Sequence, residues 1–165
     1  MKERLVMNEK FIKIENLINK EFNNKNVNII KLYWNIGFIL NNDEFTYKEI
    51  VMLDRYLLSK YGIMVGFSRR NLLNIKKFYK LYCNSDLYEK LIKIEWYNHL
   101  WIMRSNYNEK NKIIDLCSKY ILSVDDLKKI TFSKSLPKMQ IKQDLEHDEI
   151  LREFKLLQQR FNNDK

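Results

Sequence analysis

Glycine and proline are nearly absent from this chain, which contains only 3 Gly and 1 Pro in 165 residues. Turns between many short strands depend on these residues, so a many-stranded sandwich or barrel is disfavoured. Apolar residues instead recur at helical spacing along nearly the whole sequence, and they make up most of its 45% hydrophobic fraction. We therefore expect a mostly α, compact multi-helix domain that needs no disulfide or metal to hold its core.

The breaks between the periodic segments locate the expected elements. Gly62 stands where a glycine would end a helix, Ser68 is a candidate N-cap, and Ser123 with Asp126 resembles a capping box. A short β-segment could occupy residues 62–67, and Pro137 marks a boundary between a domain at 1–135 and a helical tail at 138–165. The expected helical or apolar segments are 14–22, 27–42, 50–61, 68–82, a short helix from 85, 94–103, 109–120, 123–130 and an amphipathic helix in the tail.

Positive charge is concentrated in one part of the chain. The formal net charge is +9, and the 31 residues from Arg55 to Ser85 include seven Lys or Arg and no Asp or Glu. Solvated surfaces usually intersperse both signs, so this window indicates an anion-binding surface, most simply for DNA or RNA. An acidic protein surface is the alternative partner. No membrane span or signal peptide is evident, and we expect a cytoplasmic protein without a membrane partner.

The basic window includes a unit that resembles a helix-turn-helix, with helices at 50–61 and 68–82 and a linker longer than usual. Leu72, Ile75, Tyr79 and Tyr82 are expected on the inner side of the second helix. Arginine in its first turn would attract a phosphate, and Arg and Asn can pair with guanine and adenine. The alternative is that Arg69 or Arg70 pairs with a carboxylate of a neighbouring helix. The predicted nucleic-acid-binding residues are Arg69, Arg70, Asn71, Asn74, Lys76, Lys77 and Lys80.

Three separated segments resemble one known family. Residues 32–37 read Leu-Tyr-Trp-Asn-Ile-Gly, residues 66–72 read Gly-Phe-Ser-Arg-Arg-Asn-Leu, and residues 95–99 read Glu-Trp-Tyr-Asn-His. In this order they resemble the N-terminal domain of the YhcG-like PD-(D/E)XK nucleases, from about residue 11 to residue 130. The resemblance implies a helical module that binds DNA or partners and is attached to a nuclease. Only 28 residues follow Pro137, too few for that nuclease, so we expect a free-standing N-terminal domain.

Nothing in the sequence indicates an enzyme, a cofactor or a metal site. Glu153 and Lys155 match part of the nuclease signature, with Asp144 and Asp148 upstream, but residues two apart do not share a helix face. His99 lies in the most aromatic segment, where a buried, hydrogen-bonded histidine is the expected state. The glycine-loop nucleotide motifs are absent. The two cysteines, Cys83 and Cys117, are expected as reduced thiols.

Two functional hypotheses follow. The first is a non-catalytic nucleic-acid-binding domain that uses the basic helix. The second is a protein-interaction module that regulates or inhibits a nuclease complex, for example a phage-encoded anti-defence or anti-CRISPR protein. The absence of Ala and the abundance of Lys, Asn and Ile fit AT-rich coding, as in a low-GC bacterium or its phages.

The tail carries an apolar stripe that cannot remain in water on a lone helix. It must pack against the first helix, Phe11–Phe22, or against the same tail of a second copy, and we expect a homodimer through this C-terminal helix. The stripe comprises Ile141, Leu145, Ile150, Phe154, Leu157 and Phe161.

Overall fold

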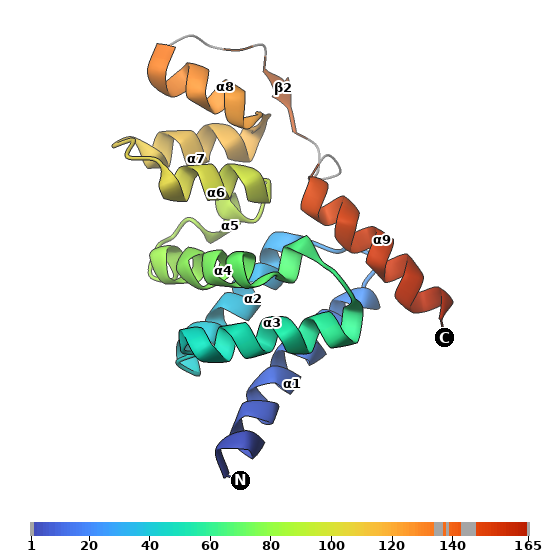
Figure 1. Ribbon diagram of the computed structural model, residues 1–165. Helices are drawn as coiled ribbons and strands as arrows, with labels where there is room; N and C mark the ends of the chain where they lie inside the picture. The colour runs from blue at the N-terminus through green and yellow to red at the C-terminus, as the bar shows by residue number, and fades with distance from the viewer. Residues whose placement is uncertain (1, 134–136, 138, 143–147, 165) are drawn as a thin grey trace.

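The computed structural model describes residues 2–133, 137, 139–142 and 148–164 and is helical almost throughout, which confirms the mostly α prediction. Helices α3, α4, α6, α7 and α8 lie in successive layers, and α9 runs along one side of them (Figure 1). Within the described residues, no helix combines the length and the apolar character needed to cross a bilayer. The elements are α1 (Lys2–Phe22), α2 (Ile29–Asn42), α3 (Tyr47–Tyr61), η1 (Val65–Phe67), α4 (Arg69–Tyr82), α5 (Tyr88–Leu91), α6 (Trp96–Arg104), α7 (Lys110–Lys119), β1 (Tyr120–Ile121), α8 (Val124–Lys128), η2 (Lys129–Ser133), β2 (Gln140–Ile141) and α9 (Glu149–Asn163).

The helix ends follow the capping residues of the sequence. The hydroxyl of Ser68 accepts the N–H of Asn71 at the start of α4, and Gly62 ends α3 with a φ of 79°, a conformation that favours glycine. Ser123 and Asp126 form the expected capping box of α8. These three predictions are confirmed.

Three features differ from the sequence expectation. Helix α1 begins at Lys2, well before the apolar period that marked it. Residues 65–67 form the 3₁₀ turn η1 rather than a β-segment. Strands β1 and β2 pair antiparallel, with Tyr120 opposite Ile141, and they were not expected because strands of two residues carry no readable period.

Helix α4 packs closely against α2. At Gly37 of α2, an added methyl group would lie 2.6 Å from Cβ of Tyr79 and 2.9 Å from the carbonyl oxygen of Ile75, so only glycine permits this approach. Leu72, Ile75 and Phe78 of α4 are fully buried. The inner side therefore includes Phe78, which was not expected there, whereas Tyr79 and Tyr82 are half-buried.

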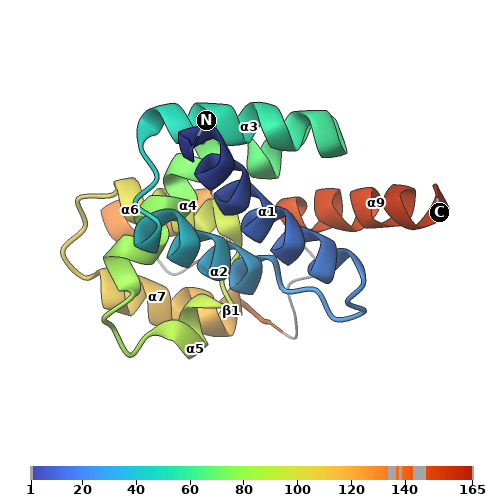
Figure 2. The ribbon, with the colours of Figure 1, turned by 90° about the horizontal axis from the view of Figure 1, so that it is seen from below.

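Helix α9 packs against the chain's own first helix. The ring of Phe22 in α1 stacks on Phe154 and on Phe161, with centroids 5.1 Å and 4.8 Å apart. Figure 2 shows the C-terminal part of α1 beside α9. Of the two packing alternatives for the apolar stripe, the structure has the intramolecular one. This packing does not require a second copy, and the homodimer through the C-terminal helix stays a prediction.

Not every residue of the stripe is covered by this packing. Ile150 and Phe154 are buried and Phe161 is partly buried, but Ile141 in β2 is 73% exposed, and Leu145 lies outside the described residues.

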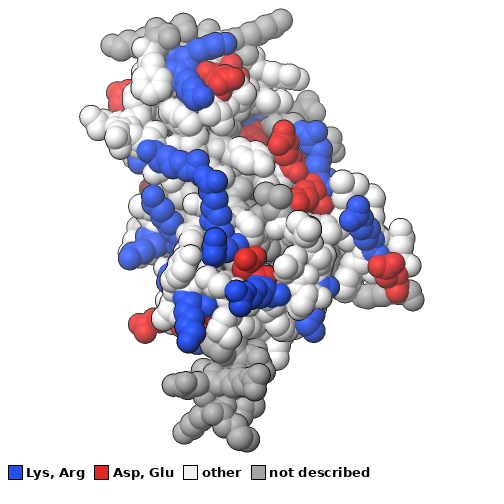
Figure 3. All heavy atoms as spheres, in the orientation of Figure 1, with Lys and Arg blue, Asp and Glu red and all other residues white. Residues whose placement is uncertain are grey.

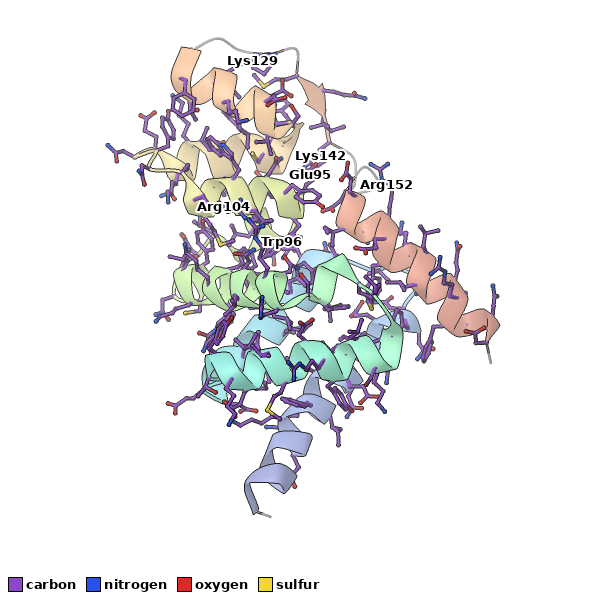
Figure 4. The ribbon with its side chains drawn as sticks, in the orientation of Figure 1. Glu95, Trp96, Arg104, Lys129, Lys142 and Arg152 are labelled. Carbon is purple, nitrogen blue, oxygen red and sulfur yellow. The ribbon has the colours of Figure 1, made fainter. Side chains whose placement is uncertain are left out.

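Two buried polar contacts attach the C-terminal segment to the rest of the domain. Nζ of Lys142 lies 2.9 Å from Oε2 of Glu95, and both side chains are less than a tenth exposed. The carboxylate of Asp148 accepts the N–H of Trp96 at the start of α6 and also caps α9. Figure 4 shows Lys142 and Glu95 meeting beside the first turn of α9. The C-terminal segment is thus integrated into the core rather than appended to it.

Candidate nucleic-acid interface

The seven predicted nucleic-acid-binding residues all lie on α4, but they differ in exposure. Asn74 and Lys76 are half-buried, and Asn71 is only 7% exposed. The exposed members are Arg69, Arg70, Lys77 and Lys80.

Asn71 is a structural residue, and its prediction as a base-reading residue is wrong. Its amide nitrogen donates to the carbonyl oxygen of Gly66 at 2.6 Å, and its amide oxygen accepts the indole N–H of Trp96 at 2.7 Å. Both hydrogen-bonding ends are therefore used inside the protein. The spacing gave a usable signal, because position 71 precedes Ile75 by four and Phe78 by seven and so shares their inner face.

Lys76 is also held by the protein itself. Its Nζ donates to the carbonyl oxygen of Phe45 at 2.5 Å, and its own carbonyl accepts the side-chain amide of Asn41. This lysine joins α4 to the connection between α2 and α3. Its prediction as an outward phosphate ligand is wrong, because its ammonium group is directed at the backbone.

Among the described residues, the exposed cations of α4 have no acidic partner within ion-pair distance. None of the ion pairs among the described residues includes Arg69, Arg70, Lys77 or Lys80. The alternative in which Arg69 or Arg70 pairs with a neighbouring carboxylate is thus not observed in the described part of the chain. Figure 3 shows Lys and Arg gathered over α4 and α6, whereas both signs occur over α9.

A cleft of about 440 Å³ lies between the start of α4 and helix α6. Residues 97, 101 and 104 of α6 share one helix face, and residues 70 and 74 share a face of α4. The lining is mostly apolar, with an arginine from each helix. It comprises Ser68, Arg70, Asn71, Asn74, Trp96, Tyr97, Leu100, Trp101, Arg104, Val124 and Ile150.

The sequence analysis missed the α6 side of this cleft. Tyr97 is 41% exposed and Trp101 is half-buried, and Arg104 is exposed without an ion pair among the described residues. The available signal was the spacing Tyr97, Trp101, Arg104, which places two aromatic rings and a guanidinium on one face. Burial raises the pKa of Tyr97, with Glu149 and Glu153 of α9 adding to the effect. The described lining is therefore cationic toward α4 and α6, whereas α9 contributes only Ile150 to it.

A second hollow, of about 740 Å³, adjoins the start of α2 and shares no lining residue with the cleft. The described residues that line it include six lysines, no aromatic ring and no carboxylate. Lys119 and Lys142 are already paired with Asp115 and Glu95. The lining is Lys25, Asn26, Val27, Asn28, Lys31, Ile92, Lys93, Ser118, Lys119, Ile141, Lys142, Leu151 and Lys155.

His99 is a core residue. Its Nε2 lies 2.9 Å from the carbonyl oxygen of Leu91, and its ring packs against Phe78 with centroids 4.7 Å apart. Complete burial lowers the pKa of His99 to about 4, so the ring is neutral near pH 7, and it is not accessible from the surface. The expectation of a buried, hydrogen-bonded histidine is confirmed.

The structure also places most of the other residues that the sequence analysis considered for catalysis or metal binding. Both cysteines are free; Cys117 is buried, which raises the pKa of its thiol to about 12, and Cys83 is half-buried. Asp148 is a helix cap. Within the described residues no three His, Cys, Asp or Glu side chains gather as metal ligands, and Asp144 and His147 lie outside those residues.

Comparison with known proteins identifies a family. No curated protein and no solved structure matches the chain. The family model of the DUF1016 N-terminal domain matches residues 12–136, which is the YhcG-like N-terminal region that the sequence segments resembled. The match includes the second half of α1 and the whole of α4 and α6, whose residues form the two arginine-bearing walls of the cleft, and it ends before β2 and α9. The chain therefore belongs to the DUF1016 N-terminal domain family.

Proposed function

We propose that this protein is a non-catalytic nucleic-acid-binding domain. The observation that supports this most is a surface of one sign: exposed Arg and Lys side chains on α4 and at the end of α6 without ion pairs among the described residues. Such a surface attracts a polyanion. The proposed backbone contacts are Arg69, Arg70, Lys77, Lys80 and Arg104.

The first turn of α4 gives a physical reason for an anionic ligand. The turn has no acidic residue, and it begins with Arg69 and Arg70. Cations at the positive end of a helix dipole are each unfavourable by about 0.3–1 kcal/mol. A phosphate bound at this end makes the electrostatic interaction favourable, because the helix dipole and both guanidinium groups attract it.

The salt dependence of binding tests the proposal. Five phosphate contacts give a slope of log affinity against log salt of about −3.5 for a single strand and about −4.5 for B-DNA. Fluorescence anisotropy with a labelled oligonucleotide between about 50 and 300 mM salt measures this slope. Absence of binding at low salt, or binding that does not change with salt, would contradict the proposal.

A matched pair of charge reversals identifies the surface. Arg70→Glu on α4 is expected to weaken binding by roughly 10- to 100-fold, because a phosphate contact becomes a repulsion. Arg160→Glu makes the same charge change at an exposed site on α9 and is expected to leave affinity within about twofold. Thermal melting should be unchanged for both. Equal losses of affinity would show that only net charge matters.

The apolar lining of the cleft favours a second candidate, an acidic protein partner such as a component of a nuclease complex that this domain regulates or inhibits. Apolar side chains of a partner can enter such a cleft while its acidic rim meets the arginines. Affinity purification from the native host at low and high salt separates the two. Nucleic acid recovered only at low salt favours the first proposal, and a stoichiometric protein that survives nuclease and high salt favours the second.

A further inference from the structure

We infer that the cleft between α4 and α6 receives an unpaired base of a single-stranded nucleic acid, whose phosphates lie against Arg70 and Arg104. This inference rests on the proposed function and gives it a substrate class. It follows from the lining of the cleft, the charges at its mouth and the position of α4 within the fold.

The lining of the cleft suits the flat face of a base. Tyr97 and Trp101 come from successive turns of α6 and offer two aromatic rings in a cleft whose 440 Å³ lies within the size range of small-ligand pockets. Base stacking on such side chains accepts any base, because every base has a π-face.

The cleft is also rigid at its base. Trp96 is fully buried, its indole N–H is bound by Asn71, and its backbone N–H is bound by Asp148. Its ring contacts Tyr33 edge-to-face, with centroids 4.7 Å apart. Figure 4 shows Trp96 between α6 and α4 and Arg104 on the same helix. A preformed cleft of this kind loses little conformational freedom when a ligand binds.

The charged and polar groups of the cleft are arranged for a nucleotide. Arg70 and Arg104 stand on opposite walls, one from each helix, and both are exposed. Asn74 also lines the cleft, and its side chain makes no hydrogen bond with other described residues, so its amide can pair with a base edge. From α9 the described lining includes only Ile150, which offers no positive charge to a phosphate. The phosphates therefore lie toward the arginines and the base points inward.

The position of α4 argues against reading a duplex through its grooves. A recognition helix must project so that the residues of its first turns reach base edges. Here α4 contacts α2, α3 and α6, and its third residue, Asn71, faces inward. Paired bases keep their faces stacked inside the duplex and cannot enter the cleft. An unpaired base can.

Two hairpins that carry one fluorescent adenine analogue test the inference, with the analogue either in the loop or paired in the stem of otherwise equal hairpins. We expect the protein to quench only the loop analogue and to bind a loop-free duplex of the stem sequence about tenfold more weakly than the hairpin. Tyr97→Leu and Trp101→Leu are each expected to reduce hairpin affinity about tenfold and to leave duplex affinity unchanged. Tyr47→Leu changes an exposed tyrosine on α3 that does not line the cleft, and it is expected to behave as wild type.

The outcomes separate the two proposals. Equal affinity for hairpin and duplex, with no quenching in the loop, would overturn the unpaired-base inference and leave nucleic-acid binding intact. Binding to neither probe at low salt would overturn both. If Trp101→Leu melts at a lower temperature than wild type, the more exposed Tyr97→Leu decides the result, and an unchanged hairpin affinity in that variant would reject stacking in the cleft.

Discussion

Helices α4 and α9 bury similar apolar faces but differ in the charges on their outer faces. α4 buries Leu72, Ile75 and Phe78, and its exposed charged residues are all Arg or Lys. α9 buries Ile150, Leu151 and Phe154, and both acids and bases occur on its other faces. Both helices contribute to the lining of the same cleft, α9 through Ile150 alone among the described residues.

This difference separates a charge pattern that serves solubility from one that serves binding. On a mixed-sign face, each charge is balanced by water and by neighbouring charges of the opposite sign. On a single-sign face, the like charges repel one another until a ligand of the opposite charge binds. The expected consequence is that stability changes follow the inner faces of both helices, while binding changes follow only the outer face of α4.

The largest expected effect concerns the attachment of the α9 segment. Lys142→Met leaves Glu95 buried without its cation and is expected to destabilise the protein by about 3–5 kcal/mol. Lys155→Met, at an exposed position on α9, is expected to stay within about 0.5 kcal/mol. Urea denaturation measures both. Equal stability of the two variants would mean that the segment is not integrated as the structure indicates.

The next prediction concerns the pH dependence of the free energy of unfolding, and it compares a buried titratable group that contacts α4 with one at the start of α9. His99 contacts α4 and has a pKa lowered to about 4, below its unfolded value of 6.5. The unfolded state therefore binds a proton first, and stability is lost as pH falls from about 6.5 to 4, by about 3 kcal/mol in all. At the start of α9 the sign is opposite, because burial raises the pKa of Asp148 and acid relieves that cost.

Denaturation curves at several pH values check this prediction. In His99→Gln the loss of stability between about pH 6.5 and 5 is expected to be smaller than in wild type, whatever the starting stability of the variant. The same slope in both proteins would show that His99 is not the group responsible.

A smaller effect is expected where α4 meets α6. Asn71→Ala leaves the indole N–H of Trp96 buried without an acceptor and is expected to cost about 2 kcal/mol, or roughly 4–8 °C in Tm. Asn74→Ala removes a side chain with no hydrogen bond to described residues and is expected to melt like wild type. Calorimetry distinguishes them, and a neutral Asn71→Ala would contradict the structural role.

The smallest expected effect is a change in nucleic-acid binding, caused by substitutions on the outer faces of α4 and α9. Lys77→Gln on α4 is expected to weaken oligonucleotide binding about fivefold and to reduce the salt slope by about 0.7–0.9, the share of one phosphate. Lys155→Gln on α9 is expected to change neither value. A reduced slope in both variants would place α9 within the nucleic-acid surface.

The sequence was informative where local chemistry decides the structure. Helix positions, the cap at Ser68 and the glycine end at Gly62 were predictable because periodicity and capping act over a few residues. Spacing could have placed Asn71 on the inner face of α4, but the hydrogen-bond partners of Asn71 and Lys76 were not predictable, because they lie 25 and 31 residues away in the chain. The α6 wall of the cleft was missed for the same reason: its aromatic residues look like core until the neighbouring helix is placed.

The position of Asp148 affects how the protein unfolds locally. One carboxylate accepts hydrogen bonds from the first turns of α6 and of α9, so a displacement of Asp148 removes this cap from both helices. The two turns should therefore unfold as a single cooperative unit, and their amide protons should exchange with solvent at matched rates. Since Trp96 lies in the first turn of α6, a fluctuation that releases α9 would also loosen the floor of the cleft, and a ligand held there would slow the exchange of both.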